Sequence, residues 1–140
     1  MMETKAFQQT YFLYVEDDAS NRKVMQLIMQ KVMKVNGLAI FENSQDFMAR
    51  VKALPQPPQV ALLDIHVRPY DGFAMLEMLR ADPDYQNTKA IALTASVTNE
   101  EVEKLRTSGF DGAISKPLRV STFPDLLMRI LNGEKIWHIA

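Results

Sequence analysis

Four short apolar runs in the sequence each lead into residues suited to phosphate or cation chemistry. The four are Glu16-Asp17-Asp18 after run 11–15, Asp64 after run 60–63, Thr94 after run 90–93, and Lys116 after run 113–115. If these runs are parallel strands, their carboxyl ends lie at one edge of a sheet, which is where such folds bind ligands. We therefore expect acidic groups, one hydroxyl and one lysine to converge there. That combination indicates a site for a divalent cation and a phosphoryl group.

The chemistry expected of this set follows from its charges. Three carboxylates at close range repel one another and stay ionised together only when a cation compensates. An all-oxygen ligand set favours Mg²⁺. A carboxylate can also attack phosphorus and form an aspartyl-phosphate, and Asp64 is the best candidate because it stands alone at its strand end. Mg²⁺ and Lys116 would supply positive charge to the phosphoryl oxygens, and the Thr94 hydroxyl would donate a hydrogen bond.

Each of these residues also has a plainer interpretation. Asp17 or Asp18 could cap the helix that follows, and Asp64 could be a turn residue. Thr94 could be an ordinary strand-end hydroxyl, and Lys116 a solvated charge. The occurrence of all of them at strand ends of one chain favours the functional interpretation.

Composition limits the classes of protein to consider. The chain has 140 residues, of which 47% are hydrophobic and 24% charged, as is typical of one globular domain. Its net charge of −1 gives no electrostatic reason to expect nucleic-acid binding. The absence of cysteine excludes disulfides and thiolate metal sites. No apolar run approaches the roughly 20 residues of a membrane span, so we expect a cytoplasmic protein that binds no membrane.

The pattern of apolar runs predicts five strands alternating with five helices. The strands are expected at 11–15, 38–41, 59–63, 90–93 and 112–115, and the helices at about 19–35, 44–54, 72–80, 98–108 and 122–131. Such alternation predicts an α/β fold, a three-layer sandwich with a parallel sheet between helices. The flavodoxin-like strand order 2-1-3-4-5 is a common solution, and it places the first and third strands side by side. We expect one domain, with a core over about 11–131 and tails at 1–10 and 132–140.

Several local signals refine these elements. Within the first helix, apolar residues at helical spacing are Val24, Leu27, Ile28 and Val32. Ser44 and Thr98 are predicted N-caps, and Gly37 and Gly109 are suited to left-handed helix ends. The apolar segment 136–139 either packs back on the domain or meets a partner, and the sequence does not choose between these.

Together these residues resemble the receiver domain of two-component response regulators. The matching positions are Glu16-Asp17 (the acid pair after the first strand), Asp64 (the phosphoacceptor), Asp71-Gly72, Thr94-Ala95 (the switch hydroxyl and its small neighbour), and Lys116-Pro117 (the lysine and a proline whose peptide bond is usually cis). Any one dipeptide is weak evidence. The whole set, in order and on the expected elements over residues 11–131, is specific.

The resemblance implies roles for these residues. Asp17 and Asp64 would bind Mg²⁺ directly, with the backbone carbonyl of His66 as a third protein ligand and Glu16 acting through water. Asp64 would accept the phosphoryl group from a histidine kinase or a histidine phosphotransfer protein, with Thr94 and Lys116 assisting. In-line attack of water would later remove the phosphate. The chain would thus be a phosphoacceptor rather than a turnover enzyme.

Three departures from the family pattern bear on this expectation. Arg68 stands four residues after Asp64, where a proline is usual, and could overhang the site. Ala113 stands where an aromatic residue usually follows the movement of the threonine. His66 and Ser96 occupy the positions that flank the path of the attacking water. We therefore expect His66 to alter the rate of phosphate loss, and we do not expect the usual threonine–aromatic coupling through Ala113.

The expected output is a change of protein contacts or a phosphate relay. Only about nine residues follow residue 131, so an output domain would require that the sequence is a piece of a longer protein. The resemblance implies a contact surface on the fourth helix, fifth strand and fifth helix, which could also form a homodimer. One alternative is a receiver-fold interaction module that phosphate does not switch. A second is a hydrolase with an aspartyl-phosphate intermediate, which His66 disfavours because such enzymes usually carry a second aspartate at that position.

Overall fold

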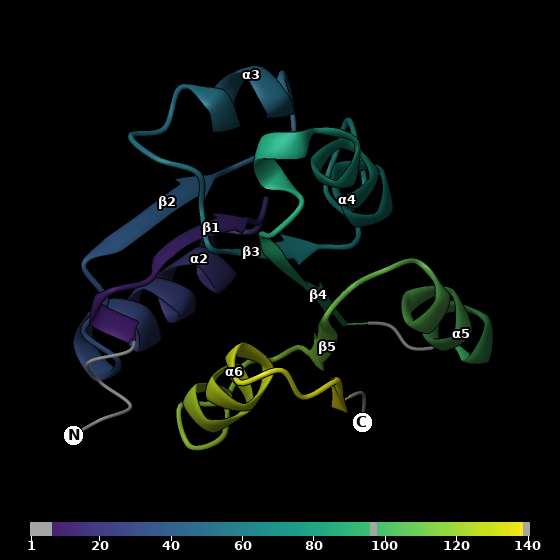
Figure 1. Cartoon of the computed structure of the whole chain (residues 1–140). Helices are drawn as coiled ribbons and strands as arrows, with labels where there is room; N and C mark the ends of the chain where they lie inside the picture. The colour runs from purple at the N-terminus through teal and green to yellow at the C-terminus, as the bar shows by residue number, and fades with distance from the viewer. Residues whose placement is uncertain (1–6, 96–97, 139–140) are drawn as a thin grey trace.

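The computed structural model describes residues 7–95 and 98–138, and Figure 1 shows their arrangement. The elements are β1 (Tyr11–Val15), α2 (Ala19–Gln26), the π-helix η1 (Leu27–Val32), β2 (Gly37–Phe41), α3 (Phe47–Lys52), β3 (Val60–Asp64), α4 (Gly72–Ala81), the 3₁₀-helix η2 (Pro83–Tyr85), β4 (Lys89–Thr94), α5 (Asn99–Thr107), β5 (Gly112–Ser115), α6 (Phe123–Leu131) and β6 (Ile136–His138). Within the described residues, no helix is both long enough and apolar enough to cross a membrane.

The strands form one parallel sheet in the order β2-β1-β3-β4-β5-β6. The predicted α/β class and the order of the first five strands are confirmed. Every residue of β3 is buried, as expected for a central strand covered on both faces. Since β1 and β3 are neighbours, their carboxyl ends form the crevice where the strand order reverses.

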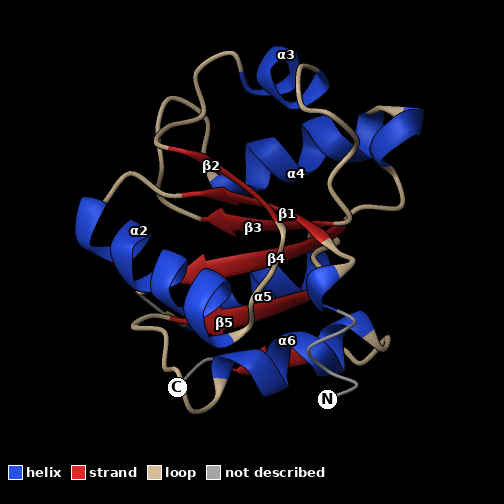
Figure 2. Ribbon diagram, turned by 90° about the vertical axis from the view of Figure 1, so that its left-hand side faces the viewer, coloured by secondary structure: helices blue, strands red, loops and turns tan. Residues whose placement is uncertain are grey.

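Helices cover both faces of the sheet (Figure 2). One face packs against α3, α4 and α5 through a core cluster that includes Phe47, Val51, Met75, Leu79 and Leu105. The other face packs against α2, η1 and α6 through a second cluster that includes Met25, Ile28, Met29, Phe123 and Leu127. The sheet is therefore held from both sides, and its carboxyl edge is a fixed platform for the side chains that follow the strands.

The predicted tails are wrong in two places, because both ends of the described chain join the core. Phe7 is 3% exposed and belongs to the second cluster. Ile136–His138 forms a sixth strand, β6, beside β5. Its alternation explains why: Ile136 packs on the second cluster and Trp137 on the first, as successive strand residues point to opposite faces. The apolar segment thus packs back on the domain.

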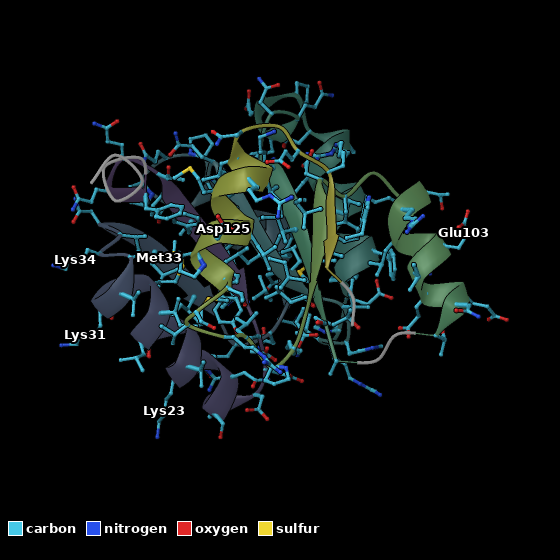
Figure 3. The ribbon with its side chains drawn as sticks, turned by 90° about the horizontal axis from the view of Figure 1, so that it is seen from below. Lys23, Lys31, Met33, Lys34, Glu103 and Asp125 are labelled. Atoms are coloured by element: carbon cyan, nitrogen blue, oxygen red, sulfur yellow. The ribbon has the colours of Figure 1, made fainter. Side chains whose placement is uncertain are left out.

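The first helix differs from its predicted course and face. It is α-helical to Gln26 and continues as the π-helix η1, where the Met33 N–H donates to the Ile28 carbonyl at 2.8 Å. The buried residues are Met25, Ile28 and Met29, which have the i, i+3, i+4 spacing of a core stripe. Val24, Leu27 and Val32 are instead 40, 53 and 44% exposed. Figure 3 shows Lys23, Lys31 and Lys34 directed outward from this helix.

Two predicted caps are wrong. Ser44 does not cap α3, whose N-cap is Asp46 in a left-handed conformation with φ 50°. Gly37 begins β2, and the positive φ of 57° after η1 belongs to Lys34. A Cβ on Gly37 would lie 2.4 Å from the Tyr11 ring, so the glycine serves close packing between strands.

The predicted ends of α5 are confirmed. The Thr98 hydroxyl accepts from the Glu101 N–H at 3.1 Å and caps the helix. Gly109 has a φ of +102° just beyond its last turn. This capping sets the first residue of α5.

Candidate functional site

Acidic side chains from β1 and β3 meet at the carboxyl edge of the sheet. Glu16 and Asp17 follow β1, and Asp64 ends β3. Carboxylate oxygens of these three residues lie within 4.8 Å of one another. Glu16 and Asp64 are buried, whereas Asp17 is exposed, so the cluster faces solvent on the side of Asp17. Their proximity follows from the pairing of β1 with β3 in parallel register.

Lys116 reaches this cluster from β5, on the far side of β4. Its Nζ lies 3.0 Å from Asp64 Oδ2 and 3.2 Å from Glu16 Oε1. The Lys116 N–H donates to the Thr94 carbonyl at 2.8 Å, which ties the start of this loop to the end of β4. The peptide bond between Lys116 and Pro117 is cis. The structure therefore places one ammonium directly between two buried carboxylates.

Glu16 has a setting that disfavours its charged form. The pKa of Glu16 is raised to about 7. The largest cause is burial, and the neighbouring Asp64 carboxyl adds to the increase. Lys116 lowers the pKa by less than these two effects raise it. Two donors besides Lys116 hold the carboxylate: the Tyr14 hydroxyl at 3.2 Å and the Asp18 N–H at 3.4 Å. Burial, and then the charge of Glu16, raise the pKa of the Tyr14 phenol, which therefore stays a proton donor. A cation that enters the cluster would therefore stabilise the ionised form of Glu16.

Asp64 is kept ionised by its partners. Burial alone would raise its pKa, but hydrogen bonding with Glu16, the His66 N–H and Lys116 lowers the pKa overall. The His66 N–H donates to Asp64 Oδ1 at 3.0 Å. Burial likewise opposes the charge on Lys116, but Asp64 and Glu16 raise the pKa of the ammonium. An ionised aspartate beside a charged lysine is the state required of a nucleophile toward a phosphoryl group.

The three acidic residues after β1 have different roles. Asp18 is the N-cap of α2, and its carboxylate accepts from the Asn21 N–H at 2.9 Å. The capping interpretation therefore holds for Asp18, while Glu16 and Asp17 turn to the cluster. Three carboxylates, two from the end of β1 and one from the end of β3, form a donor set that fits a hard cation such as Mg²⁺. The three predicted carboxylates are thus brought together.

The loop after Asp64 is fixed by Ser44, for which the sequence predicted a different role. Ser44 is buried, and its hydroxyl accepts from the Tyr70 N–H and donates to the Tyr70 carbonyl, both at 2.7 Å. The Ser44 N–H donates to the Arg68 carbonyl at 3.0 Å. These bonds clamp the loop from the β2–α3 connection. The sequence predicted Ser44 as a helix N-cap, because serine is favoured at that position.

Gly72 has a steric role that explains the Asp71-Gly72 pair. A Cβ on Gly72 would lie 3.0 Å from Ile65 Cα and 3.1 Å from the Asp64 carbonyl oxygen. Glycine therefore lets α4 start against the backbone at the end of β3. Asp71 caps the same helix by accepting from the Ala74 N–H at 2.8 Å. The pair positions the helix and leaves the Asp64 backbone undisturbed.

Thr94 ends β4 and is 1% exposed. Asp64 pairs in register with Leu93, so Thr94 follows directly beside it at the sheet edge. The Ile65 N–H donates to the Leu93 carbonyl at 3.1 Å, which continues the strand pairing past the site. Ser96, the expected neighbour of the water path, lies outside the described residues.

A groove of about 940 Å³ opens beside the site, between the β3–α4 loop and α5. His66 and Arg68 line one side, and Glu101 and Lys104 line the other. His66 Nε2 lies 3.5 Å from Glu101 Oε1, and Lys104 Nζ lies 4.2 Å from the centre of the Phe73 ring. The His66 ring thus bridges the β3–α4 loop and α5. Arg68 borders the groove with an exposed side chain.

The family described as the response regulator receiver domain matches residues 12–128. The chain belongs to this family. It is thereby placed among the proteins of two-component signalling, and the acidic cluster corresponds in position to the site inferred from the resemblance.

Curated relatives of this receiver domain are distant in sequence. It is 26% identical over 122 residues to the signal transduction histidine-protein kinase BarA of Escherichia coli K12, covering 87% of this chain but only 13% of that protein. It is 24% identical over 120 residues to the polar-differentiation response regulator DivK of Brucella ovis, covering 86% of this chain and 94% of DivK. The chain thus spans a small part of the first relative and nearly all of the second.

Solved receiver structures show the same fold. The chemotaxis response regulator CheY4 of Vibrio cholerae superposes with a TM-score of 0.75 at 20% identity, covering 86% of this chain and 98% of that one. The receiver domain of a sensor histidine kinase from Pseudomonas aeruginosa superposes with a TM-score of 0.74 at 19% identity, covering 88% and 98%. That second structure has a magnesium ion coordinated in its active site cleft.

Proposed function

We propose that this receiver domain accepts a phosphoryl group on Asp64 in a two-component or phosphorelay system, and that phosphorylation controls its protein contacts. The observation that carries the proposal is the 3.0 Å contact between the Lys116 ammonium and the Asp64 carboxylate inside a cluster of three carboxylates. Such a pair combines a nucleophile with a fixed positive charge for the phosphoryl oxygens.

The transfer would proceed by attack of an Asp64 oxygen on the phosphorus of a phosphohistidine. A new O–P bond forms while the N–P bond breaks, and its electron pair returns to the donor's imidazole. Lys116 neutralises charge on the phosphoryl oxygens, and the Thr94 hydroxyl donates to one of them. Asp17, Asp64 and the His66 carbonyl would hold Mg²⁺ directly and Glu16 through water. When bound, the ion supplies further positive charge to the same oxygens.

The proposed donor is a histidine kinase or a histidine phosphotransfer protein. Exposed apolar side chains on the helix that follows the acidic triplet support a protein donor. Val24, Leu27 and Val32 lie on α2 and η1, and α2 begins immediately after the acidic triplet. Exposed apolar side chains near a reactive group indicate a partner-binding surface. Docking there would bring the donor's phosphohistidine to the open side of the carboxylate cluster.

The experiment that tests this proposal is intact mass after treatment with acetyl phosphate and Mg²⁺. Wild-type protein is expected to gain the mass of one phosphoryl group, and Asp64→Asn to gain none. Omission of Mg²⁺ should also prevent the gain. Equal labelling of Asp64→Asn would overturn the assignment of the acceptor.

A second candidate is a receiver-fold interaction module that phosphate does not switch. Ala113 favours it, because a methyl group in place of an aromatic side chain cannot follow a movement of Thr94. Beryllofluoride with Mg²⁺ mimics an aspartyl-phosphate, so it separates the two candidates. Amide shifts confined to the loop at Asp64 would support the unswitched module. Shifts that extend to α5 and beyond would support the switch.

A further inference from the structure

The sixth strand places the protein's one tryptophan next to Ala113. In the register of the sheet, Leu63 pairs with Ala92, Ala92 with Ala113, and Ala113 with Trp137. Register partners in neighbouring parallel strands point to the same face of a sheet. These four residues therefore form a transverse row on the face covered by α3, α4 and α5.

Two neighbouring residues of this row are alanines, whose side chain is a single methyl group. Ala92 and Ala113 are both completely buried. Trp137 is partly buried and packs on the same cluster, which also contains Leu105 of α5. The indole is thus the large side chain that borders Ala113 along the row. Thr94 lies two residues beyond Ala92 on β4, so it points to this same face at the site's edge.

The strand that carries Trp137 is a short edge strand of the described sheet. It has three residues and, within the described chain, pairs with β5 on one side. Its start is held by an exposed ion pair, Lys135 Nζ to Asp111 Oδ1 at 3.2 Å. Figure 3 shows the strand running beside β5 between α6 and α5. Short elements with few buried contacts are the ones that shift at low free-energy cost.

We propose that β6 is the element that moves on phosphorylation, with Trp137 supplying the aromatic side chain that position 113 lacks. This inference rests on the proposed phosphorylation of Asp64. As the Thr94 hydroxyl turns to the phosphoryl group, it leaves volume on its face of the sheet. Packed interiors do not keep such volume empty, and the methyl groups of Ala92 and Ala113 cannot fill it. The indole of Trp137 moves inward along the row, and β6 follows.

The consequence is a change of surface at the C-terminal side of the domain. Inward movement of Trp137 buries the indole further and shifts β6 relative to α5 and α6. The surface expected from the resemblance, on α5, β5 and α6, is here closed at its edge by β6. A partner that distinguishes the two phosphorylation states would therefore contact β6 as well as the helices beside it.

Because Trp137 is the chain's one tryptophan, its fluorescence reports this movement directly. The full chain is titrated with beryllofluoride in the presence of Mg²⁺, while the amide signals of Ile65 and His66 report formation of the adduct. We expect a blue shift of the emission and weaker quenching by iodide, with the same midpoint as the amide shifts. An adduct without any change in emission or in the β6 amides would overturn the inference and leave the proposed function intact. Absence of an adduct would overturn both.

Variants along the row test the mechanism. Ala113→Val fills part of the volume, so it should reduce the emission shift while the adduct signals at Ile65 remain. Trp137→Ala should reduce the amide shifts in α5, and Trp137→Phe, which keeps an aromatic ring, should retain them. The matched control is Ile136→Ala, because Ile136 lies on the same strand but packs on the opposite core cluster. Equal loss of the α5 response in Ile136→Ala and Trp137→Ala would contradict a specific role for the indole.

Discussion

The Lys116 ammonium lies 3.0 Å from the Asp64 carboxylate, although 52 residues separate them in sequence. The same ammonium lies 3.2 Å from Glu16, which is 100 residues away. These contacts join β1, β3 and β5 at one edge of the sheet, across the intervening β4. The site therefore exists only when the whole sheet is assembled, and its charges are balanced between elements rather than within one.

Lys116→Met should reduce the rate of phosphorylation by acetyl phosphate by about 10²-fold or more, which is the usual cost of losing one fixed donor to a transition-state oxyanion. The substitution preserves the length of the side chain and removes the charge. Intact mass against time measures the rate. Lys135→Met is the matched control, because Lys135 pairs with Asp111 away from the site. Similar losses in both variants would contradict the role of Lys116.

Stability without metal should fall as pH rises from about 4.5 to about 7. The pKa of Glu16 is raised from 4.5 to about 7 in the folded state, so between these values the folded protein holds a proton that the unfolded chain has lost. The loss is on the order of 3 kcal/mol. The lowered pKa of Asp64 acts in the opposite sense but only near and below 3.8, outside this window.

Mg²⁺ should oppose this loss of stability, because the cation compensates the negative charge that Glu16 gains beside Asp64. Thermal unfolding should therefore show a larger rise in Tm on adding Mg²⁺ at about pH 8 than at about pH 6. Glu16→Gln, which stays neutral, should show a much smaller dependence on pH in the metal-free state. An equal Mg²⁺ effect at both pH values in the wild type would contradict the assignment of Glu16.

Tyr14→Phe removes one hydroxyl that donates to Glu16 at 3.2 Å. Losing a donor to the ionised form raises the pKa of Glu16 further, so protons should compete better with Mg²⁺. We expect a several-fold weaker Mg²⁺ affinity near pH 7 and a smaller difference near pH 8.5, measured by calorimetry. Tyr11→Phe on the same strand is the control. A loss of affinity independent of pH would indicate a packing effect instead.

His66→Ala should accelerate loss of phosphate from Asp64, because it removes a ring beside the path of the attacking water. Glu101→Gln weakens the partner that lies 3.5 Å from the imidazole, and should change the rate in the same direction by less. Phosphate release after rapid removal of the donor gives both rates. An unchanged rate in His66→Ala would refute the prediction.

The sequence predicted the site more completely than the periphery. The sequence predicted that Asp64 and Lys116 lie close together. Both follow apolar runs expected to be parallel strands, and the carboxyl ends of parallel strands lie at one edge of the sheet. The physical reason is that parallel strands end together, so a residue type after each strand is enough to locate a site.

The remaining features depend on packing that a single sequence does not express. The core stripe of α2 and η1 contains Met25, Ile28 and Met29, whereas Val24 and Leu27 are exposed; which face of a helix is buried depends on how it packs against the sheet. β6 is three residues long, too short for periodicity to separate it from a tail. Ser44 was mistaken for a cap because its true partner, Tyr70, is 26 residues away.

The most direct test of the central claim is chemical mapping of the acyl phosphate. After phosphorylation with acetyl phosphate and Mg²⁺, borohydride reduces an aspartyl-phosphate to homoserine, and peptide mass spectrometry locates it. The account predicts homoserine at position 64 in the wild type and none in Asp64→Asn. Homoserine at another aspartate, or none after confirmed phosphorylation, would contradict it.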